Sequence, residues 1–180
     1  QWQALTKEYR FTTLFYTYTG NTTTASVTVT GMSTVTGLVT SPATFSVTGT
    51  GINQDTYLVS ANVTNAQVVL TQAAVSSATG ASLTFSQTKF SMPSDFDRLI
   101  DRTDWDKSKH WEMLGPESAQ QWQWLKSGYI STGPRIRYRV LGTYFQIWPP
   151  LGTNEYLGFE YVSNAWVSAV TDVLPTKTSF

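Results

Sequence analysis

The ionisable side chains that could do chemistry gather in one short segment of this 180-residue sequence. It contains five aspartates, Asp95, Asp97, Asp101, Asp104 and Asp106. A calcium-binding loop needs carboxylates at alternating positions and a glycine that turns the chain. Here the residue two places after Asp97 is Leu99, and no glycine follows until Gly115. The spacing does not match a metal site, and we expect neither a metal ion nor another cofactor.

Basic and aromatic residues lie among these acids. The segment carries four basic residues, Arg98, Arg102, Lys107 and Lys109. Such interleaved charges are typical of a salt-bridged, partly exposed surface, and tryptophans are frequent in cores and subunit interfaces. We therefore predict that the segment forms part of an interface with another subunit or partner. The predicted interface residues are Asp95, Asp97, Arg98, Asp101, Arg102, Trp105 and Trp111.

The sequence offers little for catalysis. His110 is the only histidine, and histidine catalysis needs a nucleophile on one side and an orienting group on the other. Ser108 is too close along the chain to be a persuasive partner. Asp101 and Glu117 could be proposed as a glycosidase pair, but that chemistry is defined by a carboxyl separation that a sequence does not supply. We predict that the protein is not an enzyme.

Three arginines are predicted to share one face of a strand. They are Arg135, Arg137 and Arg139, which alternate with apolar residues. A row of guanidinium groups can meet phosphates or an acidic surface, so the row is expected to face solvent, a neighbouring subunit or a DNA channel. No Gly-Lys-Ser or Gly-Lys-Thr occurs, which disfavours nucleotide hydrolysis.

The elements that position these residues fall into two compositions. Between Phe11 and Thr88 the only charged residue is Asp55. Period-two alternation and β-rich runs there predict short strands near 26–30, 45–48, 57–63, 67–71 and 82–85, with glycine-rich turns between them. We predict that residues 20–86 form an inserted, Thr/Ser/Gly-rich, all-β module that is immunoglobulin-like or barrel-like. Residues 11–18 and 83–90 would pair as its stem.

Residues 1–19 and 87–180 are predicted to form a mainly β body. Pro116 and Gly128 bracket one short helix at about 117–127. Strands at 135–140, 144–148 and 155–162 would follow it as an antiparallel meander or sandwich.

Composition limits where such a protein can work. The chain has no cysteine, which excludes disulfides and thiolate sites and is compatible with a reducing cytoplasm. Its 12 basic and 12 acidic residues cancel, so no global field favours nucleic acid or a membrane. Its apolar runs are far shorter than the ~20 residues of a membrane span, so we expect a soluble protein without a signal peptide. Because it begins at Gln1, we expect a fragment or a processed chain.

Several blocks outside residues 20–86 carry a family resemblance. They are WQALT at 2–6, MPSDFDRLIDRT at 92–103, Trp105-Asp106, Gly115-Pro116, Gln121-Trp122, the run from Pro134-Arg135 to Tyr138-Arg139, WPP at 148–150, and FEYVS at 159–163 with Trp166. In order and spacing they resemble a head-to-tail adaptor family of tailed phages. The uncharged stretch, at 46–52 and 69–74, resembles a small β-module recurrent in phage structural proteins.

The resemblance implies a structural virion protein of the neck that is assembled in the host cytoplasm. Members form a dodecameric ring below the portal protein, carry the next tail component, a tube or nozzle protein, and let DNA pass with transient, non-specific contact. Family members have portal-engaging helices before the block at Trp2 and after the block at Trp166, and this sequence departs from that pattern. The main alternative is a glycan-binding or adhesion module of a tail fibre or spike, and an enzyme acting on cell-wall sugar comes third.

Overall fold

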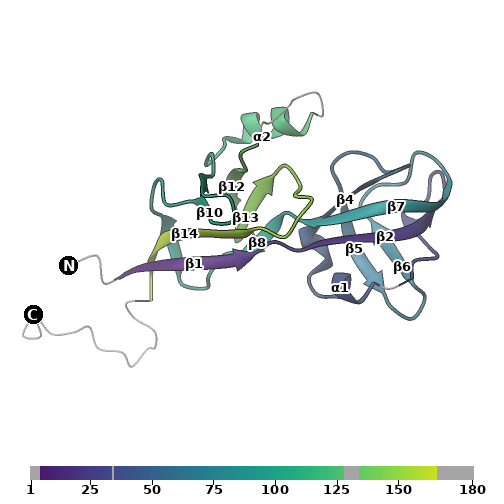
Figure 1. Cartoon of the computed structure of the whole chain (residues 1–180), viewed down its shortest axis with the longest axis horizontal. Coiled ribbons are helices and arrows are strands. Elements are labelled where there is room, and N and C mark those ends of the chain that lie inside the picture. The colour runs from purple at the N-terminus through teal and green to yellow at the C-terminus, as the bar shows by residue number, and fades with distance from the viewer. Residues whose placement is uncertain (1–4, 34, 128–133, 166–180) are drawn as a thin grey trace, which may run out of the picture.

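The computed structural model describes residues 5–33, 35–127 and 134–165, which form antiparallel sheets and two short helices. Strands make up 48% of the described residues and helices 10%, and this confirms the predicted mainly β fold class. Figure 1 shows an elongated molecule with a barrel at one end, made by residues 15–87, and a body at the other. The body consists of the described residues before and after the barrel.

The barrel is one antiparallel sheet that almost closes on itself. Its strand order is β2 (Phe15–Thr22), β7 (Ala78–Gln87), β4 (Phe45–Gly49), β5 (Thr56–Asn62), β6 (Gln67–Leu70) and β3 (Thr28–Val29). Two backbone hydrogen bonds between Asn21 and Thr30, of 2.7 and 3.1 Å, bring the β3 end back to β2. Gly20 permits this approach, because a Cβ there would lie 2.8 Å from Val29 Cγ1.

The barrel core is mostly aliphatic. Val47, Leu58, Val68 and Leu83 are fully buried in it, as the period-two pattern of their strands predicts. Two short helical turns, α1 (Thr36–Val39) and a 3-10 turn (Pro42–Thr44), were not predicted from the sequence. α1 adds the fully buried Leu38 to this core.

The body contains two sheets. The larger has the order β1 (Thr6–Thr12), β14 (Tyr156–Ser163), β10 (Trp105–Asp106) and β11 (Trp111–Glu112), with β9 (Phe96–Leu99) also paired to β14. The smaller has the order β12 (Arg137–Leu141), β13 (Tyr144–Trp148) and β8 (Lys89–Ser91). The hairpin of β12 and β13 is as predicted. The third predicted strand, β14, pairs in the larger sheet and is not a neighbour of β13.

Aromatic rings hold the two sheets of the body together. Phe145 of β13 stacks on Phe159 of β14 with ring centres 5.0 Å apart, and Tyr138 stacks on Phe145 at 4.9 Å. Phe11 of β1 and Phe90 of β8 meet at 4.4 Å. The core is therefore a continuous aromatic cluster that draws rings from both sheets.

Helix α2 (Ala119–Lys126) confirms the predicted helix but not its start signal. Pro116 follows a cis peptide bond before the helix and is not its first residue. The helix begins after Ser118, whose hydroxyl accepts the backbone N–H of Gln121, while the Gln121 side chain accepts the backbone N–H of Ser118. This capping box satisfies donors that the helix leaves free.

The predicted stem is divided between the two parts. Residues 11–18 do not form one strand, because the chain leaves β1 at the buried Thr13, which exchanges hydrogen bonds with Glu155. β1 then belongs to the body, while β2 pairs with β7 from Phe15 onward. The barrel sheet therefore starts earlier than the predicted boundary at residue 20. That the insert is a separate folding unit stays a prediction.

Candidate subunit interface

The outer face of the larger sheet carries charged side chains. In β1, Tyr9 and Phe11 point into the aromatic core, so Glu8 and Arg10 point away from it. Glu8 accepts hydrogen bonds from Arg10 and from Lys107 Nζ, the latter at 2.5 Å. Arg10 and then Lys107 lower the pKa of Glu8 to about 2, so this carboxylate stays ionised at neutral pH.

Lys107 reaches Glu8 by crossing β14 at Gly158. A Cβ on Gly158 would lie 2.7 Å from Lys107 Cε and 3.2 Å from the carbonyl oxygen of Tyr9. The missing side chain thus makes room for an ion pair that links β1 to the residue after β10 across the sheet.

Asp95 is a structural residue of the sheet edge. Its carboxylate accepts hydrogen bonds from Ser163 Oγ at 2.6 Å and Tyr161 Oη at 2.8 Å, and it forms an ion pair with Lys7 at 2.5 Å. Lys7, Ser163 and Tyr161, in that order, hold the pKa of Asp95 well below its usual range. Within the chain this carboxylate ties the segment before β9 to β1 and β14, while the predicted contact of Asp95 with a partner stays a prediction.

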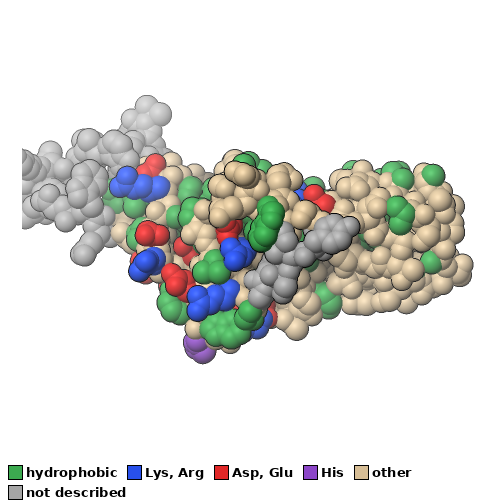
Figure 2. Space-filling view, turned by 90° about the horizontal axis from the view of Figure 1, so that it is seen from above, with side chains coloured by type: hydrophobic (Ala, Val, Ile, Leu, Met, Phe, Trp, Pro, Cys, Tyr) green, Lys and Arg blue, Asp and Glu red, His purple; other side chains and the backbone are tan. Residues whose placement is uncertain are grey.

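The other six predicted interface residues are exposed. They are Asp97, Arg98, Asp101, Arg102, Trp105 and Trp111. Of the two indoles, Trp105 is 41% exposed and Trp111 is 39% exposed. Figure 2 shows red, blue and green side chains interleaved over the body, whereas the barrel surface is mostly tan. The structure thus places exposed aromatic side chains and exposed charges of both signs within one segment of the body, at residues 97–111, although the register puts Trp105 opposite Gly158 and Trp111 opposite Asp106, on different faces of the sheet.

The remaining two aspartates of the segment are buried. Asp104 Oδ2 accepts the Tyr138 hydroxyl at 2.6 Å, and burial raises the pKa of Asp104 to about 6 although this hydrogen bond opposes the shift. Asp106 Oδ1 accepts the backbone N–H groups of Ser108 and Lys109 at 3.0 and 3.1 Å. Asp106 therefore shapes the turn that presents Trp111. Sequence reasoning missed both roles, because spacing alone does not distinguish a buried carboxylate from an exposed one.

The arginine strand has the predicted alternation but contacts its own chain. Ile136 and Tyr138 are buried. Arg137 Nη1 pairs with Glu117 Oε1 at 2.5 Å. Arg139 Nε donates to Gln146 at 2.9 Å, and its guanidinium lies 4.6 Å from the centre of the Trp122 ring.

The sequence left three possible environments for the arginine row, namely solvent, a neighbouring subunit and a DNA channel. Helix α2 and the turn before it instead cover two members of the row, Arg137 and Arg139. Only Arg135 of the three is exposed.

A junction that the sequence did not reveal joins the barrel to the body. Lys126 at the end of α2 pairs with Asp55 at 2.5 Å, and its side chain is only 11% exposed. Lys89 Nζ lies 4.1 Å and Lys126 Nζ 5.2 Å from the centre of the Tyr57 ring. Burial, and next the charge of Lys126, lower the pKa of Lys89. A usable signal was present, because Asp55 is the only charged residue between Phe11 and Thr88.

The candidate catalytic residues are not brought together. Glu117 is held by Arg137, whereas Asp101 lies in an exposed turn before β10. His110 is exposed in the turn between β10 and β11, and the Ser108 hydroxyl accepts the backbone N–H of Tyr156 at 2.7 Å. These placements supply no nucleophile, base and orienter in one place within the described residues.

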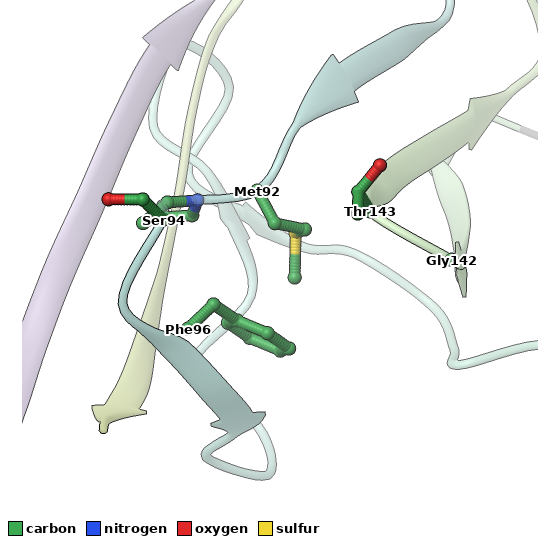
Figure 3. A pocket seen from close by; sticks show the side chains of 6 residues that line it. Met92, Ser94, Phe96, Gly142 and Thr143 are labelled. Atoms are coloured by element: carbon green, nitrogen blue, oxygen red, sulfur yellow. The ribbon is translucent and has the colours of Figure 1, made fainter. Parts of the chain in front are cut away.

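An apolar pocket of about 250 Å³ opens between the β8–β9 connection and the β12–β13 turn. Its lining residues are Met92, Pro93, Ser94, Phe96, Gly142 and Thr143, none of which is ionisable. Figure 3 shows the side chains of Met92 and Phe96 on one side of the gap and Thr143 on the other. Such a pocket can take an apolar group but carries no acid or base for catalysis.

The remaining features concern metal sites and membrane-spanning helices in the described residues. Within it, no group of three or more histidine, cysteine or acidic residues is arranged to hold a metal ion. No helix among the described residues is long and apolar enough to cross a membrane. No family model, curated protein or solved structure matches this chain.

Proposed function

We propose that this chain is a structural, non-enzymatic subunit of a tailed-phage neck, a head-to-tail adaptor that forms a ring between the portal protein and the tail. The observation that carries the proposal is the exposure of Trp105 and Trp111 among exposed charged residues of the 97–111 segment of the body. Large exposed aromatic surfaces rimmed by polar groups are typical of interaction sites.

The blocks that resemble the adaptor family also support the proposal, because they meet in space. The run at 92–103 contains β9, Trp105-Asp106 is β10, and FEYVS at 159–163 lies within β14. β14 pairs with both β9 and β10. Blocks that are scattered along the sequence therefore meet in one sheet of the body.

In this proposal the protein acts by assembling into a ring and not by catalysing a reaction. Each copy offers one surface to its neighbour and a different surface to the next copy, and such heterologous contacts close into a ring. Buried tryptophans would supply most of the contact energy, while charges around them set the register. A dodecameric ring of this kind would hold the portal on one side and the tail tube or nozzle on the other, with DNA passing through it in the virion.

Electron microscopy and mass measurement of the purified chain test the ring. We expect ring-shaped particles for the unaltered chain and loss of rings for Trp105→Ser with Trp111→Ser. Trp124→Ser is the matched control, because Trp124 is 57% exposed on α2 but lies outside the proposed surface. Equal ring formation by both variants would contradict this assignment of the surface.

Glycan binding is the second candidate, and the same exposed tryptophans favour it. Binding of a defined glycan by the unaltered chain, lost in the Trp105 and Trp111 variant, together with particles that stay monomeric, would support the adhesion module and contradict the ring.

A further inference from the structure

Within the described residues, the second edge of strand β1 has no partner strand. β1 lies at the end of the larger sheet, and among the described residues only β14 pairs with it. Figure 1 shows β1 along one side of the body. An open edge of this length presents unpaired backbone groups that can template another strand.

The hydrogen bonds of β14 define which backbone groups are open. The N–H of Tyr156 donates to Ser108 Oγ, and its carbonyl accepts the N–H of Lys107, so both groups point away from β1. The backbone of Glu160 is bonded in the same direction, to the 100–103 turn. Because strand residues alternate, the odd-numbered residues of β14 direct their backbone groups toward β1.

Those odd-numbered residues lie opposite Phe11, Tyr9 and Lys7 of β1. These three residues therefore use their backbone groups within the sheet. The residues whose N–H and C=O groups point to the open side are Thr6, Glu8, Arg10 and Thr12.

We propose that this edge pairs antiparallel with the same edge of a second copy of the chain, with Tyr9 of each copy on the two-fold axis. In this register the open residues of one copy face the open residues of the other, so every outward backbone group gains a partner. Glu8 lies directly opposite Arg10 of the second copy, and Thr6 lies opposite Thr12. The triplet Glu8-Tyr9-Arg10 is thus self-complementary in charge about its tyrosine, while Lys7 lies opposite Phe11.

The neighbouring registers are disfavoured by the same charges. The backbone pattern also permits a two-fold axis at Glu8 or at Arg10, but then two glutamates or two arginines face each other. Like charges directly opposite destabilise a strand pair, and opposite charges contribute roughly 0.2–1 kcal/mol. Charged residues on an open edge normally prevent pairing with arbitrary strands, so here they select one partner and one register.

The inner face of β1 fits the same arrangement. Tyr9 is half-buried, and its ring lies 5.5 Å from the rings of Phe11 and Phe159. On the two-fold axis it would meet Tyr9 of the second copy. The aromatic cores of the two bodies would then become continuous below one extended sheet.

This contact is separate from the proposed ring. A two-fold contact uses the same surface on both copies, whereas neighbours around a ring meet through two different surfaces. Variants of β1 and variants of Trp105 and Trp111 therefore test different contacts, and the failure of one leaves the other standing.

Charge-reversal variants test the pairing by sedimentation. We expect a monomer–dimer equilibrium for the unaltered chain, and dimer dissociation constants raised at least about tenfold for Glu8→Arg and for Arg10→Glu, a change of about 1.4 kcal/mol. The double variant Glu8→Arg with Arg10→Glu restores opposite charges and should dimerise again. A mixture of the two single variants should form a heterodimer. Failure of both rescues, with folded proteins by circular dichroism, overturns the proposal.

Cysteine cross-linking tests the register, and the chain has no cysteine of its own. Tyr9→Cys should form a disulfide-linked dimer on mild oxidation, because facing residues of a non-hydrogen-bonded pair have Cα atoms about 4.5 Å apart, within the range of a disulfide. Thr12→Cys is the matched control on the same strand and should stay unlinked, since it faces Thr6. Linkage through Thr12 but not through Tyr9 contradicts the register, and a monomeric unaltered chain contradicts the contact itself.

Discussion

The barrel and the body have cores of different chemistry. The barrel packs mainly valine and leucine, and Asp55 is its only charged residue. The body stacks aromatic rings and also buries carboxylates, among them Asp104 and Glu155. The stability of the barrel should therefore depend little on pH and salt, while that of the body should depend on the state of its ionisable groups.

The barrel satisfies its buried polar groups with hydroxyls. Five buried threonines and serines donate to backbone carbonyls at 2.7–3.2 Å, namely Thr22, Thr44, Ser46, Thr56 and Ser86. A hydroxyl can satisfy a carbonyl without bringing a charge into the core. The high Thr and Ser content is consequently part of how this barrel folds and does not by itself indicate a binding role.

Truncation of core side chains should have the largest effect on stability and should show whether barrel and body unfold separately. All seven tryptophans lie outside residues 15–87, so their fluorescence reports the body alone, while circular dichroism reports both parts. Phe159→Ala should lower the unfolding free energy of the body by about 3–5 kcal/mol and shift the fluorescence transition. Leu58→Ala should cost about 2–5 kcal/mol and shift the circular dichroism transition only. Parallel shifts of both signals in both variants would show one cooperative unit.

Asp104 should make the body sensitive to pH. Its pKa is 3.8 in an ordinary environment and about 6 in the fold, so between these values the folded state binds the proton more tightly. Its stabilising contribution is complete below about pH 4 and is lost as pH rises through about 6, by about 2–3 kcal/mol. Asp104→Asn cannot ionise and should lack this loss in denaturant titrations followed by fluorescence.

Tyr138→Phe provides the opposite control for Asp104. It removes the hydroxyl that stabilises the carboxylate, so it should raise the pKa of Asp104 further and steepen the same pH dependence. An Asn variant with the pH slope of the unaltered protein would contradict the assignment.

Replacing different arginines of β12 and the residues before it should lower the unfolding free energy by unequal amounts. Arg137→Gln leaves Glu117, whose side chain is 7% exposed, without its cation and should lower the unfolding free energy by about 1–2 kcal/mol. Arg135→Gln, at an exposed position, should stay within about 0.5 kcal/mol. Equal small losses in denaturant titrations would mean that the Glu117 pair contributes nothing.

Local patterns predicted the elements of this protein better than their partners. Alternation located β4, β5, β6, β12 and β13, because side-chain direction in a strand depends only on neighbouring positions. It did not place β14 beside β1, since strand order depends on contacts between residues about 150 positions apart in sequence. The break at Thr13 was missed for the same reason, because its hydrogen-bond partner Glu155 is equally distant.

The candidate site shows the same limit. Exposure of Trp105 and Trp111 agrees with the interface prediction, although their use by a partner stays a prediction. Asp95 has the residue type expected of a surface acid, but three side chains of the chain itself hold it. Arg137 and Arg139 were assigned to the correct strand face, while the helix that covers this face could not be placed from periodicity alone.

The smallest expected effect concerns the junction, where the two parts of the molecule meet. Asp55→Asn removes the carboxylate that faces the nearly buried Lys126, and Lys89 lies close to the same Tyr57 ring. Because Asp55 is itself 36% exposed, solvent screens the pair, and the unfolding free energy should fall by about 1 kcal/mol or less.

The more informative result is the spacing between the unfolding midpoint followed by fluorescence and the midpoint followed by circular dichroism. This spacing should widen as barrel and body uncouple. Asp97→Asn, an exposed aspartate of the body, is the control and should leave that spacing unchanged. An unchanged spacing in Asp55→Asn would mean that the ion pair of Asp55 with Lys126 does not couple barrel and body, which would leave the coupling to the backbone connections and to contacts such as Ser86 with Leu151.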